Sequence, residues 1–546
     1  MNLRPPGYEP DELPTALLRD ISFVHTIIHK PHFLSSETFY FKALSRFYGA
    51  FLPYLRLDSD FAVTLLKRRA DIMFKREKLR TQRGFFMEKR HFNYDYSQTL
   101  WMKMFLARPD FEHNRSEVLI TFDEALDIIK TVDKLTQGIQ KIVYLVGWQG
   151  LGHDDCFPEM EKVNTALCGD SDLSGKEYLY HLFEEAKKYN TVVSFHGNVA
   201  DCYSQNPSFD EFVKADAILK DKDGNPAVIE MFNGRNAYKT SYKQYWESGL
   251  FKKYWDRFCE ATPVREAGTV HLDNFCIAQN LNPYTPVEEE IDARNKMLDY
   301  IYSLGIDVTT EYTYREQELR ADSTRHPIRK YYETFYDELP VSDFGGAPIH
   351  TLGRIPAAWH LDNVTPEDCV RIQPQEYSGR LTDAKLRAVF YNVIHGEDIW
   401  MEKGVKTEDW SEEFVRQFCL QQLPYFYLNR HKRLSIEKSG EDYTAYFSGG
   451  VISDGKTLSI TENGIKVKDG DDVLLPLDEE NRTFIAYSEN GKAGEWNIPG
   501  AVPGKAEIFE ITPDGNVPLG IAEIKRGKIN LDVKPHRALA IKAPTL

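Results

Sequence analysis

The sequence lacks the features that mark several large classes of protein. No apolar run in its 546 residues reaches the roughly 18 that a membrane span requires, so no transmembrane helix is expected. The first residues do not combine a charged stretch with an apolar one, so we expect no signal peptide. The seven cysteines are scattered without CxxC spacing, which indicates buried thiols in a reduced compartment. A cytoplasmic protein is the simplest interpretation.

Motifs that hold metals or nucleotides are also missing. There is no HExxH and no paired Cys/His spacing, so we expect no metal site. The absence of a GxGxxG or P-loop motif argues against a nucleotide-dependent enzyme. The run Asp221–Asn225 has calcium-like residues, but it lacks the glutamate at position 12 of an EF-hand loop, and a hairpin turn is simpler. A net charge of −16 argues against nucleic acid or an anionic membrane as the main partner.

The length of the sequence predicts two or three domains. Its composition and its spacing of apolar residues change twice along the chain. Residues 1–120 are rich in Leu, Phe, Arg and Lys at helical spacing, and we interpret them as a mostly helical N-terminal region. Residues 121–434 alternate helices and strands, beginning with a capping-box-like Thr121. Residues 435–546 consist of short alternating apolar and polar runs separated by Asp-Gly and Asn-Gly turns, which predicts a C-terminal β-sandwich.

The alternation in the central region requires a parallel sheet of the α/β class. Both a (β/α)8 TIM barrel and a doubly wound sheet would give this rhythm. Polar residues end several successive strands and no glycine-rich phosphate loop follows them, which favours the barrel. We expect strands at 142–148, 191–196, 227–232, 268–273 and 306–311, and helices at 121–130, 176–189, 241–259 and 286–304.

The segment from Lys141 to Asp155 carries the most informative chemistry. An apolar strand ends in Trp148, two glycines, His153 and Asp154, at the point where barrels keep their active sites. Aromatic faces cover the C–H faces of sugars, while carboxylates and imidazoles bind their hydroxyl groups, so we predict a sugar site. Trp148 fits barrel packing equally well, and we interpret Asp155 as a solvated neighbour.

A pair of carboxylates ends two further strands. Asp273 and Glu311 are separated by 311 − 273 = 38 residues, and one helix joins their strands. Neighbouring parallel strands lie about 5 Å apart, so the pair could approach the roughly 5–5.5 Å separation used by retaining glycosidases. The pattern alone leaves two interpretations open, since carboxylates at strand ends also cap helices and bind loop amides.

Other strand ends offer candidate sugar contacts. His196 and Asn198 are two residues apart, so on a continuing strand they share a face. The alternative for His196 is a packed barrel histidine, and Asp201 can simply cap a loop. Trp359 follows another apolar run and would lie over the site. Trp246 and Trp255 are better explained as core residues of a helix.

The segment Gly147-Trp-Gln-Gly-Leu-Gly-His-Asp154 resembles the GWQxxGHD motif of glycoside hydrolase family 101, the endo-α-N-acetylgalactosaminidases, and of the related family 129. The resemblance covers roughly residues 142–431. It implies a TIM barrel with Asp273 as nucleophile and Glu311 as acid/base. It also implies that Asp154 binds hydroxyl groups in the first subsite and that His196 and Asn198 match an HxN segment near the sugar. The expected substrate is then an α-linked N-acetylgalactosamine or galactose-type glycoside.

The first hundred residues do not match either family, which makes this a divergent member. Other specificities therefore stay open, such as an α-galactosidase or a β-L-arabinopyranosidase, as does a carbohydrate-binding protein without turnover. The chemistry requires no cofactor, although relatives hold a structural calcium ion that this chain could share. The expected partner is a carbohydrate, and a homo-oligomer is left open. The missing signal peptide favours an enzyme acting on imported saccharides.

Overall fold

The computed structural model describes residues 92–310 and 401–544. Short gaps fall at 96–97, 170–172, 222, 233, 274, 276–286, 403–404, 407–409, 432, 440–441 and 479–481. Most of the region interpreted as a helical N-terminal part, residues 1–91, therefore lies outside the described residues, as do Glu311 and Trp359.

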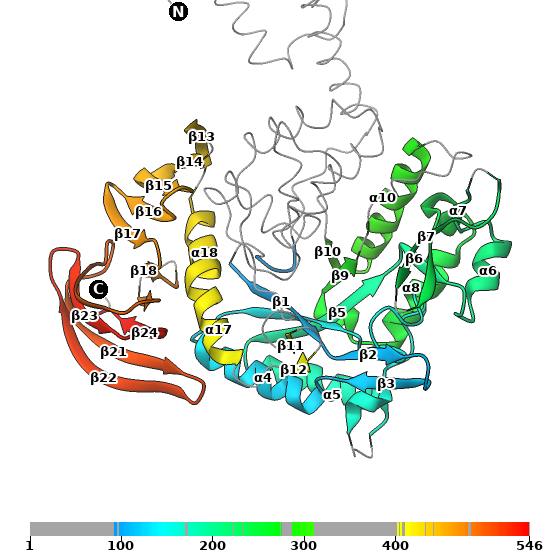
Figure 1. Ribbon diagram of the computed structural model, residues 1–546, viewed down its shortest axis with the longest axis horizontal. Coiled ribbons are helices and arrows are strands. Elements are labelled where there is room, and N and C mark those ends of the chain that lie inside the picture. The colour runs from blue at the N-terminus through cyan, green and yellow to red at the C-terminus, as the bar shows by residue number, and fades with distance from the viewer. Residues whose placement is uncertain are drawn as a thin grey trace, which may run out of the picture. The chain divides into compact units, whose positions relative to one another are not determined.

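A parallel five-stranded sheet forms the centre of the described structure (Figure 1). Its strands follow one another in chain order, without the reversal that a doubly wound sheet would show among them. They are almost wholly buried, as expected of parallel strands covered on both faces. The predicted strands at 142–148, 191–196 and 268–273 are confirmed, and the one at 306–311 is confirmed as far as Thr310, where the described residues end. The sheet consists of β1 (Leu100–Phe105), β4 (Lys141–Val146), β5 (Thr191–Asn198), β9 (Thr269–Asp273) and β10 (Asp307–Thr310).

Strand β1 corrects the helical interpretation of residues 1–120 for the part that the structure describes, residues 92–120. Leu100–Phe105 pairs with Lys141–Val146 along its whole length, and a hairpin of β2 (Ala107–Asp110) and β3 (Arg115–Val118) follows it. The sequence Leu-Trp-Met-Lys-Met-Phe hides this strand, because Leu and Met favour helices and Lys103 interrupts the apolar run. Lys103 is nevertheless 2% exposed.

The predicted helices connect the strands, and α4 and α5 lie side by side along the sheet (Figure 1). Helix α4 begins at Thr121, whose Oγ1 accepts a hydrogen bond from the backbone N–H of Glu124 at 3.3 Å. The predicted helix 241–259 is broken in two, because Gly249 adopts φ +78. The helices are α4 (Phe122–Leu135), η2 (Thr165–Cys168), α5 (Gly175–Lys187), α6 (Phe209–Lys214), α7 (Tyr242–Glu247), α8 (Leu250–Ala261), α9 (Val264–Ala267) and α10 (Val287–Ser303).

A small antiparallel sheet is inserted between β5 and β9. It contains β6 (Asp201–Tyr203), β7 (Val228–Phe232) and β8 (Arg235–Lys239) in the order β6-β8-β7. The predicted strand 227–232 therefore exists, but it belongs to this insertion and not to the parallel sheet. Its partner is β8, which a tight turn brings back alongside it. Residues 221–225 form the predicted hairpin turn, with the Asp221 carboxylate accepting from the N–H groups of Asp223 and Asn225 at 2.9 Å.

The C-terminal region is a ten-stranded antiparallel sheet, as the alternating pattern predicts. The separate β20–β23 pair contributes Trp496, Ile529 and Leu531 to the core on one face of this sheet, which gives a sandwich-like arrangement. Asn463-Gly464 forms a two-residue turn with φ of 51° and 78°, as a hairpin requires. Helices α17 (Trp410–Gln417), η4 (Phe418–Gln422) and α18 (Leu423–Asn429) precede it. The strands are β11 (Met401–Glu402), β12 (Val405–Lys406), β13 (Arg433–Ser439), β14 (Asp442–Phe447), β15 (Val451–Asp454), β16 (Ser459–Glu462), β17 (Ile465–Asp469), β18 (Asp472–Pro476), β19 (Thr483–Ser488), β20 (Lys492–Asn497), β21 (Gly504–Thr512), β22 (Gly515–Ile524), β23 (Lys528–Val533) and β24 (Arg537–Lys542).

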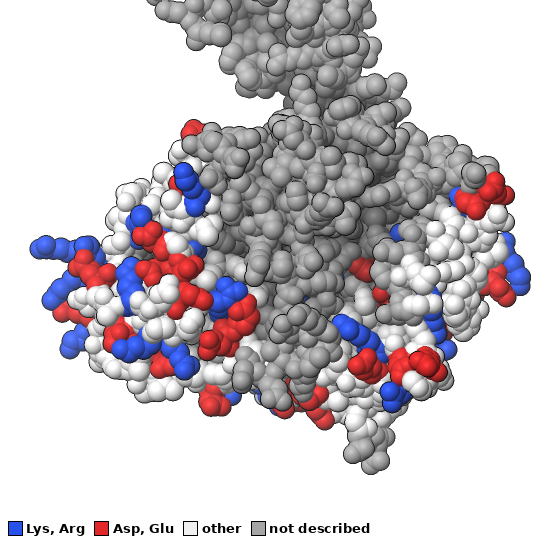
Figure 2. Space-filling model, viewed as in Figure 1, with Lys and Arg blue, Asp and Glu red and all other residues white. Residues whose placement is uncertain are grey.

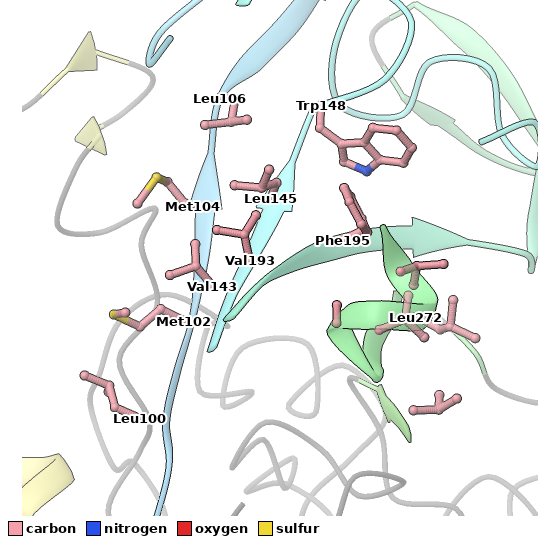
Figure 3. Packing of buried hydrophobic residues seen from close by; sticks show 14 of the residues in the cluster. Leu100, Met102, Met104, Leu106, Val143, Leu145, Trp148, Val193, Phe195 and Leu272 are labelled. Atoms are coloured by element: carbon pink, nitrogen blue, oxygen red, sulfur yellow. The ribbon is translucent and has the colours of Figure 1, made fainter. Parts of the chain in front are cut away.

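The main core packs the parallel sheet against its helices. Alternate residues of β1 and β4 enter it, and Figure 3 shows Trp148 and Phe195 pointing toward one another at its end. Each fully buried side chain of this size contributes roughly 1.5–3 kcal/mol of transfer free energy. The core therefore fixes the ends of β4 and β5, where the polar residues follow.

The surface is mixed in charge. Figure 2 shows Lys and Arg interspersed with Asp and Glu on the visible face of the described residues, without a large patch of one sign. Within the described ranges, no helix is both long and apolar enough to span a lipid bilayer.

Thr121→Ala tests the capping box of α4. Loss of the hydroxyl leaves the N–H of Glu124 without its acceptor, so we expect the free energy of unfolding to fall by about 1 kcal/mol. Urea unfolding followed by circular dichroism measures the change. Thr131→Ala in the middle of the same helix is the control and should be near neutral, because alanine is the better helix former. Equal losses in both variants would contradict a capping role.

Candidate functional site

The carboxyl ends of β5, β9 and β10 bring polar side chains to one edge of the sheet. His196 is paired in register with His271, and Asn198 with Asp273. Thr309 lies opposite His271 on the other side, and the two side chains are joined by a hydrogen bond of 2.9 Å between Nδ1 and Oγ1. Parallel pairing therefore assembles the site from three separate stretches of sequence.

Three imidazole rings lie in a row across this edge. The ring centroids of His153 and His196 are 5.3 Å apart, and those of His196 and His271 are 5.4 Å apart. The middle ring approaches the candidate nucleophile, with 3.7 Å between His196 Nε2 and Asp273 Oδ2. His196 is 2% exposed, whereas the Asp273 side chain is 18% exposed, so the carboxylate is the accessible member of the pair. This geometry suits a carboxylate that is held by a buried imidazole on one side and is accessible to a ligand on the other.

His153 and Asp154 form a second cluster beside the first. Their side chains approach to 3.4 Å between Nε2 and Oδ2, and both are largely but not fully buried. The His153 ring also packs edge-on against Phe105 of β1, at 5.1 Å between centroids. The structure thus brings the predicted residues His153, Asp154, His196 and Asp273 to one region.

The loop that carries these residues has an unusual backbone. Gly147 has φ +75, and a Cβ there would lie 2.2 Å from the carbonyl oxygen of Ala107. Asp154 and Cys156 also adopt positive φ, of 61° and 67°, although they are not glycines. Such conformations cost of order 1–2 kcal/mol per residue and persist only where the surroundings impose them.

Asp155 corrects the interpretation as a solvated neighbour. It is 6% exposed, and its carboxylate accepts a hydrogen bond from the backbone N–H of Leu151 at 2.8 Å. The other carboxylate oxygen is 3.1 Å from Nη1 of Arg235 on β8. The burial follows from the tight turn, which folds the side chain back over its own loop.

Trp148 is a core residue, and the prediction that it offers its face to a sugar is not supported. The ring is 0% exposed and packs against Phe195 and Phe258, at 4.8 and 5.8 Å between centroids. Its Nε1 donates to the carbonyl oxygen of His196 at 3.0 Å. Trp148 therefore fixes the backbone at His196 from the core side.

Asn198 shapes the end of β5 in the same way. Its Oδ1 accepts hydrogen bonds from the N–H groups of Ala200 and Asp201 at 2.8 and 2.9 Å. Its Nδ2 donates to Asp201 Oδ2 at 2.6 Å, and the other Asp201 oxygen accepts from Lys239 Nζ. Asn198 is 0% exposed and has little capacity left for a sugar, so its role in this structure is to hold the turn.

Sequence reasoning missed the two basic residues of β8, Arg235 and Lys239. No local pattern points to them, because their carboxylate partners lie 80 and 38 residues away. It also missed Tyr144, which lies under His271 at 5.7 Å between ring centroids and whose hydroxyl is 2.7 Å from Thr269 Oγ1. Burial raises the pKa of the Tyr144 hydroxyl well above its usual range, so it stays protonated.

The described part of the chain offers little for other chemistries. It contains no group of three or more His, Cys, Asp or Glu side chains arranged to hold a metal ion. Burial raises the pKa of the Cys156 thiol to about 12 and that of Cys202 further, so neither is a reactive thiolate. Cys276 lies outside the described residues.

Comparison with protein families gives a match to glycoside hydrolase family 101, endo-α-N-acetylgalactosaminidase, over residues 110–324. The match includes the whole GWQxxGHD segment, Asp273 and Glu311. Comparison with curated proteins gives no match.

Among solved structures, the chain is similar to the α-N-acetylgalactosaminidase NagBb from Bifidobacterium bifidum in complex with GalNAc, at 13% identity and a TM-score of 0.43. The similarity covers 67% of this chain and 57% of that enzyme, so the chain spans a little over half of its length. The maltogenic α-amylase AmyB from Thermotoga neapolitana is similar at 11% identity and a TM-score of 0.34, over 83% of this chain and 100% of that one.

These structural likenesses are weak, and the resemblance to a family depends on the sequence match over residues 110–324. That match confirms the resemblance expected from the Gly147–Asp154 segment. Over residues 110–324, the chain is therefore similar to glycoside hydrolase family 101, the endo-α-N-acetylgalactosaminidases.

Proposed function

We propose that the chain is a retaining glycosidase that cleaves an α-linked N-acetylgalactosamine or galactose-type glycoside. Asp273 is the nucleophile and Glu311 the acid/base. The observation that carries this proposal is the position of Asp273: it ends β9, is partly exposed, and stands 3.7 Å from the buried His196. The family match over residues 110–324 supports the sugar class.

The register of β9 and β10 supports the pairing of the two carboxylates. The described pairs end at Leu272 and Thr310, an offset of 310 − 272 = 38 residues. Continued by one residue, the same offset would set Glu311 opposite Asp273. Two residues earlier, His271 and Thr309 project to the same side and share a hydrogen bond. Because side chains repeat every two residues along a strand, Asp273 and Glu311 would share that side if the strands continue.

The reaction then proceeds in two displacements. The Asp273 carboxylate attacks the anomeric carbon while the glycosidic C–O bond breaks and Glu311 gives its proton to the leaving oxygen. Water next attacks the same carbon, Glu311 takes its proton, and the bond to Asp273 breaks. The configuration at the anomeric carbon is retained after two inversions.

The neighbouring residues supply binding and positioning. His153 and Asp154 present a ring nitrogen and a carboxylate to sugar hydroxyl groups. His196 stabilises the Asp273 carboxylate and orients it, since its own backbone is fixed by Trp148. We include in the proposal the (β/α)8 barrel, which the consecutive order of the five described strands supports. Its closure lies outside the described residues.

Asp273→Asn and Glu311→Gln test the two catalytic roles. Release of p-nitrophenol from a panel of α- and β-glycosides is measured for each, with the anomer of the product followed by NMR. We expect wild-type cleavage of an α-galactosaminide or α-galactoside with retention. Asp273→Asn should abolish it, and Glu311→Gln should lower kcat by about 10²–10⁴-fold.

Asp292→Asn is the matched control, because Asp292 is exposed on α10, where its carboxylate pairs with Lys296 across one helical turn. It should keep full activity. Cleavage of a different glycoside, lost in the same two variants, would preserve the mechanism and discard the sugar class. Sugar binding without cleavage of any glycoside would indicate a carbohydrate-binding protein.

Lys239→Met tests the ion pair that holds the end of β5. Lys239 and Asp201 have side chains that are 8% and 7% exposed, so removing the cation leaves a buried charge uncompensated. We expect the free energy of unfolding to fall by about 3–5 kcal/mol. The more exposed Lys243–Glu289 pair provides the control, and Lys243→Met should cost less than about 1 kcal/mol.

Adding Asp201→Asn to Lys239→Met should recover part of the loss, because the double variant no longer buries a lone charge. Urea unfolding measures all four proteins. A similar loss in Lys239→Met and Lys243→Met would show that the buried pair has no special weight.

A further inference from the structure

Asp155 is one of the groups that hold the strained loop between Gly150 and Cys156, together with backbone hydrogen bonds such as the one from the N–H of His153 to the carbonyl oxygen of Ala107. One carboxylate oxygen accepts the N–H of Leu151 at 2.8 Å, and the carbonyl oxygen of Asp155 accepts from Gln149 Nε2 at 3.3 Å. The next residue toward the N-terminus is Asp154, whose positive φ turns its carboxylate to His153. Because the two residues are adjacent in this turn, the hydrogen bonds of Asp155 restrict the backbone that carries Asp154.

The other carboxylate oxygen of Asp155 is bound by Arg235, which comes from outside the loop. Nη1 of Arg235 lies 3.1 Å from Asp155 Oδ1, and the Asp155 side chain is 8% exposed. A charge so well buried needs a partner, because desolvation would otherwise oppose its ionised form. Arg235 supplies that partner from β8, in the sheet inserted between β5 and β9.

A third element fixes Arg235 itself. Its guanidinium lies over the ring of Phe111, 3.1 Å from the centroid, and Phe111 stands at the turn between β2 and β3. Stacking on an aromatic ring restricts the planar guanidinium to one orientation, which a lysine could not reproduce. The side chain thus joins three elements that are distant in sequence: the β2–β3 hairpin, the 149–156 loop and the β7–β8 hairpin.

We propose that Arg235 is a positioning residue for substrate binding, acting through Asp155 to hold Asp154 and His153 in place for the sugar. This inference deepens the proposed function and rests on it. Arg235 does not touch the sugar in this scheme. Its effect is on the affinity of a preformed site, so it contributes equally to the bound substrate and to the transition state.

Arg235→Gln and Asp155→Asn test the proposal through kcat, KM and amide exchange. With the glycoside that the wild-type chain cleaves best, each variant should raise KM about tenfold and leave kcat within about twofold, as expected when uniform binding is lost. Peptides covering residues 149–156 should exchange their amide hydrogens faster, because the N–H of Leu151 loses its fixed acceptor. Combining the two substitutions should add little to either one alone.

Arg257→Gln is the matched control. Arg257 has the same two kinds of contact, with Glu161 at 3.6 Å and over the Tyr254 ring at 5.6 Å, but it is 46% exposed and its carboxylate partner is Glu161 and not Asp155. It should change neither KM nor exchange at 149–156. Arg235→Lys should fall between wild type and Arg235→Gln, because it keeps the charge and loses the stacking.

Two results would overturn the proposal: unchanged exchange at 149–156 in Arg235→Gln, or faster exchange with an unchanged KM. The second result would show that Arg235 holds the loop but does not influence substrate binding. A wild-type chain that cleaves no glycoside defeats the proposed function instead. Exchange at 149–156 in the variants then decides by itself whether Arg235 holds the loop.

Discussion

The parallel pairing of β5, β9 and β10 is the constraint on which the rest of the site depends. It fixes which residues stand beside one another, His196 with His271 and Asn198 with Asp273, although they come from stretches separated by whole helices. The alternation of side chains then sends His196, His271 and Thr309 to one side. A hydrogen bond and two ring contacts can form there only because the backbone has already set the spacing. The backbone hydrogen bonds between these strands therefore set the positions of the site side chains.

Two buried ion pairs fix the geometry of the site, and burying them costs stability. The Asp201–Lys239 and Asp155–Arg235 pairs are both largely removed from water. Replacing such pairs with well-packed apolar residues is often neutral or stabilising, so stability alone does not explain them. What each pair does here is determine one conformation of a turn that follows a strand. The first holds the end of β5 below Asn198, and the second holds the loop after β4. The two ion pairs carry a desolvation cost, and in return they select a specific geometry at two strand ends.

Local pattern was sufficient for much of the fold. The capping box at Thr121, the apolar strands of the parallel sheet and the Asn-Gly turns of the C-terminal region depend on nearby residues, and each was predictable. Strand β1 was missed because its Met and Lys residues favour helices and only pairing with β4 makes it a strand. His153, Asp154, His196 and Asp273 were found because they end strands. Asp155 was misjudged, and Trp148 was left open between a sugar contact and barrel packing, since burial depends on how a loop folds back. Arg235 and Lys239 gave no signal, because their partners are set by tertiary contacts alone.

Strand β8 carries both basic residues on the same face, since Arg235 and Lys239 are four positions apart. Lys239 lies directly opposite Asp201 on β6, while Phe232 opposite Arg235 closes the turn to β7. A slip of β8 by one residue would turn both cations to the other face at once and leave two carboxylates without their cationic partners. The ladder of β7 and β8 is already irregular between Val228 and Glu230. The pairing register of the inserted sheet is therefore linked to the site. Arg235 can reach Asp155 after β4, and Lys239 can reach Asp201 after β5, in the same alignment of β8.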